Sequence, residues 1–304
     1  MHYQEAVDAF FTPRPEGTPV PAVVADPTPA RRLRDAAEPI AMHAVWSRPT
    51  NEALERLGLD FLAAYVWGRA AALGDASSPV VAATFAWFEP AMIAAIVDPA
   101  RDAVGRTDLM TARDLATIAS LEAVLADEDG AAIEGVADTL LAALGAAQPA
   151  GRPLFAGLRS LPVPSSPAGK LWRACDLLRE LRGDSHITAV LAAGLGPIEA
   201  NILTERWLGM DLATYTGTRG WSAEAMTAAV EGLGDGGLLD GDQLTELGRA
   251  VRAAIEASTD IQVEPVIAAL GGGLDSLCRA LGHWSERCIE AGAFPGDELK
   301  RAAG

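Results

Sequence analysis

Apolar residues recur at intervals of three and four along most of this sequence, and this spacing limits the fold more than any other feature. Leu54, Leu57, Phe61, Leu62 and Tyr65 are one example. Residues three or four apart share one face of an α-helix, so the pattern predicts amphipathic helices. Half of the residues are hydrophobic, which is enough for a substantial core. We therefore expect a mainly α protein.

Strand signals are scarce by comparison. Two β-branched runs, TPVPAVVA at 18–25 and PVVAAT at 79–84, are short. We expect the few strands to form short β-hairpins, the wings of winged-helix units.

Proline-rich stretches divide the chain. Residues 11–30 should be extended, because proline fixes φ and lacks an amide donor. A second such stretch, GRPLFAGLRSLPVPSSPAGK, reads as a linker. The predicted organisation is a Pro-rich N-terminal extension at 1–30, a helical winged-helix-like domain at 31–150, a linker at 151–170 and a C-terminal winged-helix-like domain at 171–304.

The two halves share a weak internal similarity. AAALGDASSPVV at 70–81 resembles LAAGLGPIEA at 191–200, and FEPAMIAAIVD at 88–98 resembles SAEAMTAAVEG at 222–232. A tandem duplication accounts for this, and so does chance similarity between Ala-rich helices.

The second half carries the clearest winged-helix pattern. Asp184 fits the N-cap of a helix that ends before the GLGP turn at 194–197, where Pro197 suits the next helix start. Ser222 fits a further N-cap, and the glycines of 232–237 permit a hairpin before a long closing helix. This order is typical of the MarR-type winged helix.

Segments spread over residues 31–256 also resemble the SalK-like helix-turn-helix proteins of actinobacteria. These segments are RRLRDAAEPIAMHAV, WGRAAALG, FEPAMI, GRPL, LWRACDLLRELRGDSHITAVLAAGL and TRGWSAEAMTAAVEGLGDGGLL. The resemblance implies the helix-turn-helix fold and no particular reaction, ligand or DNA site.

The charge of the chain argues against nucleic acid and membrane partners. The formal net charge is -17 and the pI is about 4.6. Between 185 and 260, four arginines stand against eleven acidic residues, and the expected recognition helix at 222–232 has no Lys or Arg. DNA binding requires cations that neutralise phosphates. DNA binding would still be possible for a homodimer that presents Arg249 and Arg252 to the phosphates.

Local motifs indicate no metal, disulfide or cofactor. The three cysteines form no Cys-x-x-Cys pair, and the four histidines lack the His-x-x-x-His spacing of a zinc helix. The nucleophile elbow, the phosphate-binding loop and the dinucleotide fingerprint are missing as well. The sequence has no signal peptide or membrane span, so we expect a cytoplasmic protein.

Candidate ligand-binding residues occur in both halves. LLRELRGDSH at 177–186 is a dense polar group that could bind a carboxylate or polarise a carbonyl, with Asp184 or Glu199 orienting His186. In the first half, Arg69 lies among apolar residues and needs a partner such as Glu38 or Glu89. The alternative for 177–186 is a solvated helix end, and the alternative for the apolar and aromatic residues of the first half is ordinary core packing. The predicted ligand-binding residues are His43, Trp67, Arg69, Phe88, Arg182, Asp184, His186 and Glu199.

These features predict a small-molecule-binding protein on an acidic winged-helix scaffold that does not bind DNA. The ligand would lie at the seam between the halves, with catalysis on it left open. The alternatives are a MarR-like, ligand-responsive transcriptional regulator and an interaction module for a basic partner protein.

Overall fold

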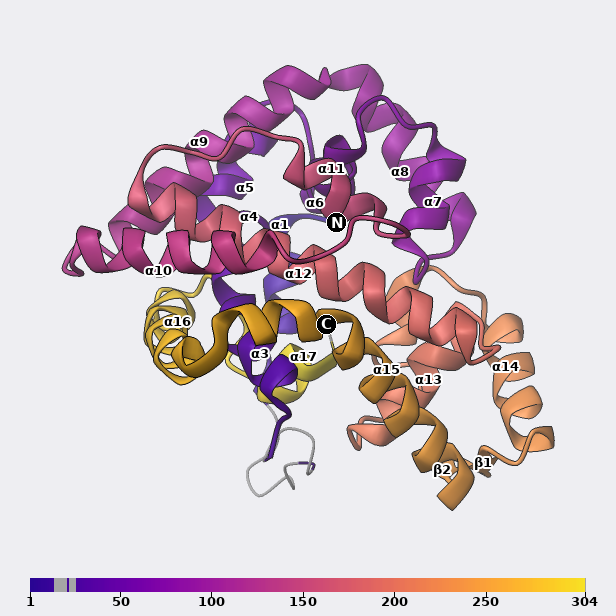
Figure 1. Cartoon of the computed structure of the whole chain (residues 1–304). Helices are drawn as coiled ribbons and strands as arrows, with labels where there is room; N and C mark the ends of the chain where they lie inside the picture. Colours follow the sequence, from indigo (N-terminus) through magenta and orange to yellow (C-terminus); the bar gives the residue numbers. More distant parts are fainter. Residues whose placement is uncertain (14–20, 22–25, 304) are drawn as a thin grey trace.

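Helices dominate the computed structural model, which describes residues 1–13, 21 and 26–303 (Figure 1). The N-terminal half contains α1 (Tyr3–Phe10), α3 (Pro29–Ala41), α4 (His43–Trp46), α5 (Arg48–Glu55), α6 (Phe61–Ala70), η1 (Ala71–Leu73), α7 (Ser78–Phe85), α8 (Pro90–Ala103), α9 (Arg106–Val124), α10 (Gly130–Leu144) and α11 (Pro153–Arg159). The C-terminal half contains α12 (Pro167–Ala192), α13 (Pro197–Trp207), η2 (Thr216–Arg219), α14 (Ala223–Asp235), β1 (Leu239–Asp240), β2 (Gln243–Leu244), α15 (Glu246–Leu270), η3 (Gly271–Gly273), α16 (Leu274–Glu290) and α17 (Glu298–Ala303). The prediction of a mainly α protein is confirmed.

Helix α12 crosses the centre of the molecule and packs against α3, α10, α11 and α15 (Figure 1). Its N-terminus is capped by Ser166, whose hydroxyl accepts the Gly169 N–H at 3.3 Å, and Pro167 occupies the first turn. The helix runs on without a break to Ala192. Asp184 therefore lies inside α12, so the prediction that it caps a helix start is wrong.

The largest apolar cluster joins elements from both sides of the predicted linker. It combines Leu33 of α3, Leu140 of α10 and Trp172 of α12 with Val266 of α15 and Leu281 of α16. The linker itself contains α11 and the first turn of α12. The domain boundaries at 30, 150 and 170 stay a prediction.

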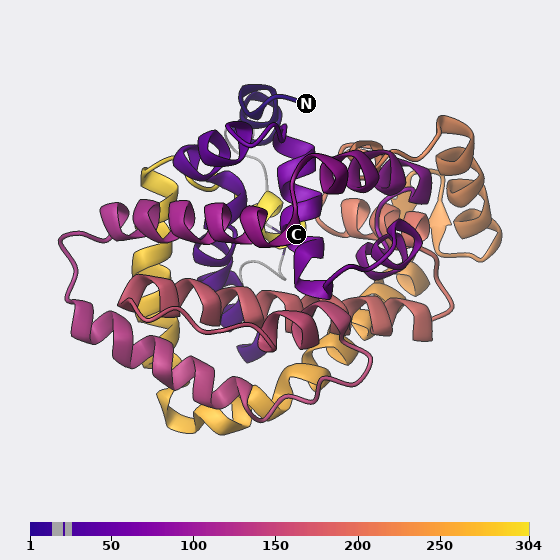
Figure 2. The same cartoon turned by 90° about the horizontal axis from the view of Figure 1, so that it is seen from above.

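One β-hairpin occurs among the described residues, and it lies in the C-terminal half as expected. β1 pairs antiparallel with β2, Leu239 opposite Leu244, across a turn in which Gly241 has φ of +59°. Leu203 of α13 and Leu233 of α14 pack with both leucines of the hairpin. In Figures 1 and 2 these elements lie together beside the C-terminal end of α12.

The wing expected in the N-terminal half has no counterpart among the residues that the structure describes. The run at 79–84 belongs to helix α7, because Pro79 suits a first helical turn and burial of Val81 and Phe85 outweighs β propensity. The run at 18–25 lies, except for Pro21, outside the described residues.

No single helix in the described part of the chain is long and apolar enough to cross a membrane. Helices α12 and α13 reach that length and apolarity only as a pair, and they meet at a bend of 106°.

Candidate functional site

A cavity of about 550 Å³ lies between the two halves of the chain. Its walls come from α1, α3, α4, α6 and the turn before α8 on one side, and from α12, α13, α15, the segment 215–220 and the C-terminal residues on the other. Cavities of roughly 300–1,000 Å³ are typical of small-molecule sites.

Arginine is the most frequent charged residue in the cavity wall. Three glutamates, Glu38, Glu180 and Glu256, also line the cavity. Seven arginines and three glutamates give these lining side chains a formal charge of +4, whereas the whole chain has a net charge of -17. The seven lining arginines are Arg31, Arg34, Arg69, Arg179, Arg182, Arg219 and Arg252. The wall is thus opposite in charge to the chain as a whole.

Helical spacing brings these charges together. On α3, Glu38 follows Arg31 and Arg34 at intervals of seven and four residues, and on α12 Arg179 and Arg182 share a face in the same way. Each helix therefore turns one polar stripe toward the cavity.

Glu256 on α15 is the centre of one ion-pair network. Its carboxylate accepts hydrogen bonds from Arg31 at 3.0 Å, from Arg252 at 3.0 Å and from Arg182. Burial by itself would raise the pKa of Glu256, but these three guanidinium groups outweigh it and hold the pKa well below its usual range.

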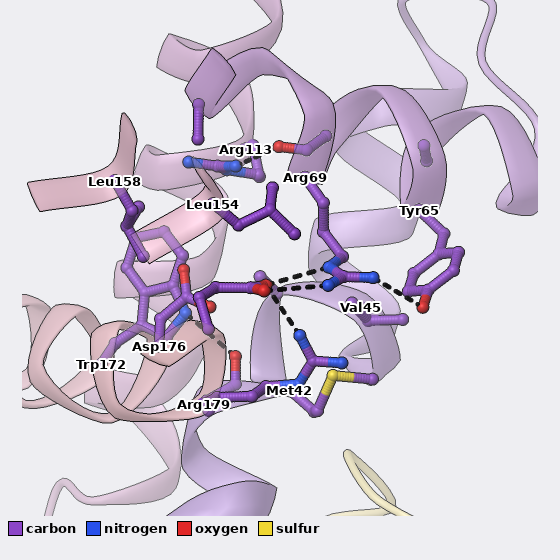
Figure 3. Close-up of a pocket in the computed structure, with 16 residues that line it drawn as sticks. Met42, Val45, Tyr65, Arg69, Arg113, Leu154, Leu158, Trp172, Asp176 and Arg179 are labelled. Carbon is purple, nitrogen blue, oxygen red and sulfur yellow. Dashed lines mark hydrogen bonds and ion pairs between the residues drawn. The ribbon is translucent and has the colours of Figure 1, made fainter. Parts of the chain in front are cut away.

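Glu180 on α12 is the centre of a second network, and Figure 3 labels three of the residues in it: Tyr65, Arg69 and Arg179. Arg69 donates to both of its carboxylate oxygens at 2.9 Å, Arg179 donates at 2.8 Å, and Arg69 also donates to the Tyr65 hydroxyl at 3.0 Å. Burial raises the pKa of Tyr65, but Arg69, Arg179 and Arg219 outweigh it and lower that pKa. Tyr65 can therefore release its proton more readily than an ordinary tyrosine.

Aromatic rings form two further parts of the wall. Trp46 and Phe61, with centroids 5.1 Å apart, pack with Phe10 of α1. Near α13, Trp87 lies 5.7 Å from the His186 ring, and Phe88 lies beside Tyr65. The cavity therefore combines cationic and flat apolar surfaces.

Four of the eight predicted site residues line the cavity: Arg69, Phe88, Arg182 and His186. The partner of Arg69 is Glu180; the expected Glu38 bonds Arg34 and Arg179, and Glu89 caps α8. His186 Nδ1 bonds the Thr259 hydroxyl at 2.9 Å, so neither Asp184 nor Glu199 orients it as expected.

The other four do not line the cavity. His43 is fully buried, with Nε2 3.0 Å from the Ser120 hydroxyl, and burial lowers its pKa to about 4. Trp67 donates to the Val104 carbonyl within the core. Asp184 accepts the Phe155 N–H at the start of α11. Glu199 lies in the first turn of α13, against Gly196.

The eight predicted ligand-binding residues leave out most of the charged wall, although the polar group at 177–186 was singled out as a whole. The signal was an arginine or glutamate recurring at helical intervals within an Ala- and Leu-rich helix, as in RRLRDAAE on α3. Several of the residues left out of that list are largely buried and have partners far away in the sequence. They are Arg31, Arg34, Glu38, Arg179, Glu180, Arg252 and Glu256.

The unit formed by α13, α14, the hairpin and the start of α15 presents few cations. Arg252 is 3 % exposed and bonds Glu256, so it is not available to DNA as the dimer interpretation requires. Arg206 pairs with Asp242 at 3.5 Å, and Arg249 donates to the Leu244 carbonyl. Helix α14 contains acidic residues and no Lys or Arg.

Within residues 1–13, 21 and 26–303, no group of three or more His, Cys, Asp or Glu side chains is arranged to hold a metal ion. Cys175, Cys278 and Cys288 are free and buried.

The fold defines a mainly helical protein with a helix-turn-helix unit and a short β-hairpin. The chain belongs to a helix-turn-helix family, since the model described as "Helix-turn-helix family" matches residues 30–295. No curated protein and no solved structure matches the chain.

Proposed function

We propose that this protein binds a small organic anion in the cavity between its halves. The observation that carries the proposal is a wall with seven arginines, three glutamates and several aromatic rings around about 550 Å³. Guanidinium groups bind carboxylates and phosphates through paired hydrogen bonds, and aromatic rings bind the apolar part of such ligands. The winged-helix unit then serves as scaffold for the cavity.

We also propose that the chain is related to the SalK-like proteins of actinobacteria and to MarR regulators, and that it forms a homodimer. Catalysis on the bound ligand would use Tyr65 or the neutral imidazole of His186 as its acid or base. Burial lowers the pKa of His186 well below its usual value.

A thermal-shift screen of aromatic and aliphatic organic acids, each beside its neutral amide, tests the proposal. Ligand at a hundredfold excess over Kd adds about 2.7 kcal/mol to the free energy of unfolding. We expect several acids, and not their amides, to raise the melting temperature.

Gly183 provides the variant that locates the binding. It lines the cavity from α12, and a Cβ atom built there meets nothing within 4 Å. Gly183→Phe should place a ring inside the cavity and reduce the shifts, while the free energy of unfolding stays within about 1 kcal/mol of wild type. Gly135→Phe, on exposed open space of α10, is the matched control that should keep them. Shifts as large in Gly183→Phe as in wild type would contradict the proposal.

The second candidate is a ligand-responsive transcriptional regulator. The family match and the hairpin beside α14 favour it, and the acidic surface of α14 opposes it. Binding of duplex DNA that weakens steeply as salt rises would support this candidate.

A further inference from the structure

Arg219 differs from the other arginines of the cavity wall in its partners. The other six each pair with a carboxylate: Arg31 and Arg34 with Asp35, Arg69 and Arg179 with Glu180, and Arg182 and Arg252 with Glu256. Arg219 forms no ion pair with any residue that the structure describes, and its Nε is buried without a hydrogen-bond partner. Arg219 is half-buried, and its Nε–H lies away from both water and any acceptor, so an anionic ligand would supply the missing acceptor.

The backbone around Arg219 is fixed. Its carbonyl accepts the Glu89 N–H at 2.9 Å, and the Trp221 indole donates to the Trp87 carbonyl at 2.9 Å. Gly220, with φ of +83°, packs so closely on Met92 that a Cβ atom there would lie 2.5 Å from its sulfur. The segment is thus clamped onto the turn that precedes α8.

Two aromatic rings hold the guanidinium group itself. Its carbon lies 4.0 Å from the centroid of the Tyr215 ring and 4.6 Å from that of Phe88. Such stacking fixes the plane of a guanidinium group and leaves its edge free to donate. Arg219 is therefore oriented before any ligand arrives.

A second unsatisfied donor lines the same cavity. Asn201 of α13 is 5 % exposed, and its amide nitrogen has no hydrogen-bond partner. Leaving a buried donor unpaired costs about 1–3 kcal/mol, and a ligand oxygen would recover this. Helix α13, which carries Asn201, contacts η2, which carries Arg219. Arg219 stacks on Phe88, and Trp87 packs with Ala200, the neighbour of Asn201.

We propose that Arg219 and Asn201 form the binding site for the carboxylate of a planar aromatic acid, whose ring lies against Trp87 and Phe88. This inference rests on the proposed function and adds the ligand class and the residues that select it. Arg219 is the specificity-determining residue, since it distinguishes an acid from its neutral amide.

Calorimetric titration of the full chain with 2-naphthoate and with 2-naphthamide tests the proposal. Wild type should bind the acid at least tenfold more tightly than the amide. Arg219→Gln should weaken acid binding at least thirtyfold and change amide binding by less than threefold. Asn201→Leu should weaken acid binding about fivefold.

Two further variants keep the test decisive. Arg219→Lys retains the charge but lacks the paired donors, and we expect a tenfold weaker acid complex even if Arg219→Gln folds poorly. Arg279→Gln removes an exposed arginine from α16 and should leave both affinities unchanged.

The outcomes separate the two proposals. Retention of the acid preference in both Arg219 variants, while wild type binds 2-naphthoate, would overturn the role of Arg219 and leave the proposed function standing. Binding of other acids from the screen but not of 2-naphthoate would overturn the ligand class assigned here. Failure of every acid to bind wild type would overturn both proposals.

Discussion

Asp184 shows how one buried carboxyl links stability to pH. Its Oδ2 accepts the Phe155 N–H at 3.0 Å, while Oδ1 has no hydrogen-bond partner. Burial raises the pKa of Asp184 to about 7, although the bond from Phe155 acts in the opposite direction. The folded state therefore holds this proton more tightly than the unfolded state does.

The sign of the effect follows from proton binding. Between about pH 4 and pH 7 the folded protein binds more protons at this site than the unfolded chain, so its contribution to stability falls as pH rises through that window. Asp184→Asn keeps an acceptor oxygen for Phe155 and removes the ionisation. Between pH 4 and pH 8, the free energy of unfolding of the variant should gain on wild type by about 2–4 kcal/mol. Urea unfolding at both pH values measures this, and parallel pH profiles would contradict it.

At the scale of elements, the hairpin and α15 meet too closely for any side chain between them. Gly248 donates its N–H to the capping Thr245 hydroxyl at 2.9 Å, and a Cβ atom on it would lie 2.1 Å from the Leu238 carbonyl oxygen. Gly248→Ala should therefore lower the free energy of unfolding by about 1–3 kcal/mol.

Gly135→Ala on α10, where a Cβ atom meets nothing within 4 Å, is the control. It should raise the free energy of unfolding by about 0.5–1 kcal/mol, because alanine is the better helix former. Denaturant unfolding followed by circular dichroism compares the two variants. Equal free energies of unfolding for Gly248→Ala and wild type would contradict the predicted clash with the Leu238 carbonyl oxygen.

Element type was predictable from the sequence where the apolar spacing is regular. The helices and the C-terminal hairpin follow from local signals, which is why Ser222 was identified as an N-cap and does accept the Ala225 N–H. The expectation of a wing strand at 79–84 was wrong, because packing of this segment as a helix outweighed the β propensity of its residues.

Partners of charged residues were not predictable. Arg69 and Glu180 are 111 residues apart, and Arg31 and Glu256 are 225 apart. No local pattern carries such pairings, since they depend on how α3, α6, α12 and α15 pack. The same limit explains the incorrect prediction of His43 and Trp67 as site residues. Their apolar surroundings in the sequence are like those of Arg69, but they lie outside the cavity.

At the scale of the whole molecule, charge is segregated. The chain has a net charge of -17, whereas the side chains of the cavity wall balance to +4. An acidic surface repels nucleic acid over a Debye length of about 8 Å at physiological salt. Carboxylates pair with six of the seven arginines of the wall, and Arg219, without an ion pair among the described residues, is the cation left for an anion in the cavity. This segregation suits a binder of small anions better than a binder of DNA.

A crystal structure of the complex with the organic acid that stabilises the protein most would test the central claim most directly. The account predicts electron density for the acid within the cavity, its anionic group in hydrogen-bond contact with Arg219 and its apolar part against the aromatic wall. Density for the acid on the outer surface alone, with the cavity filled by the protein's own side chains, would contradict it.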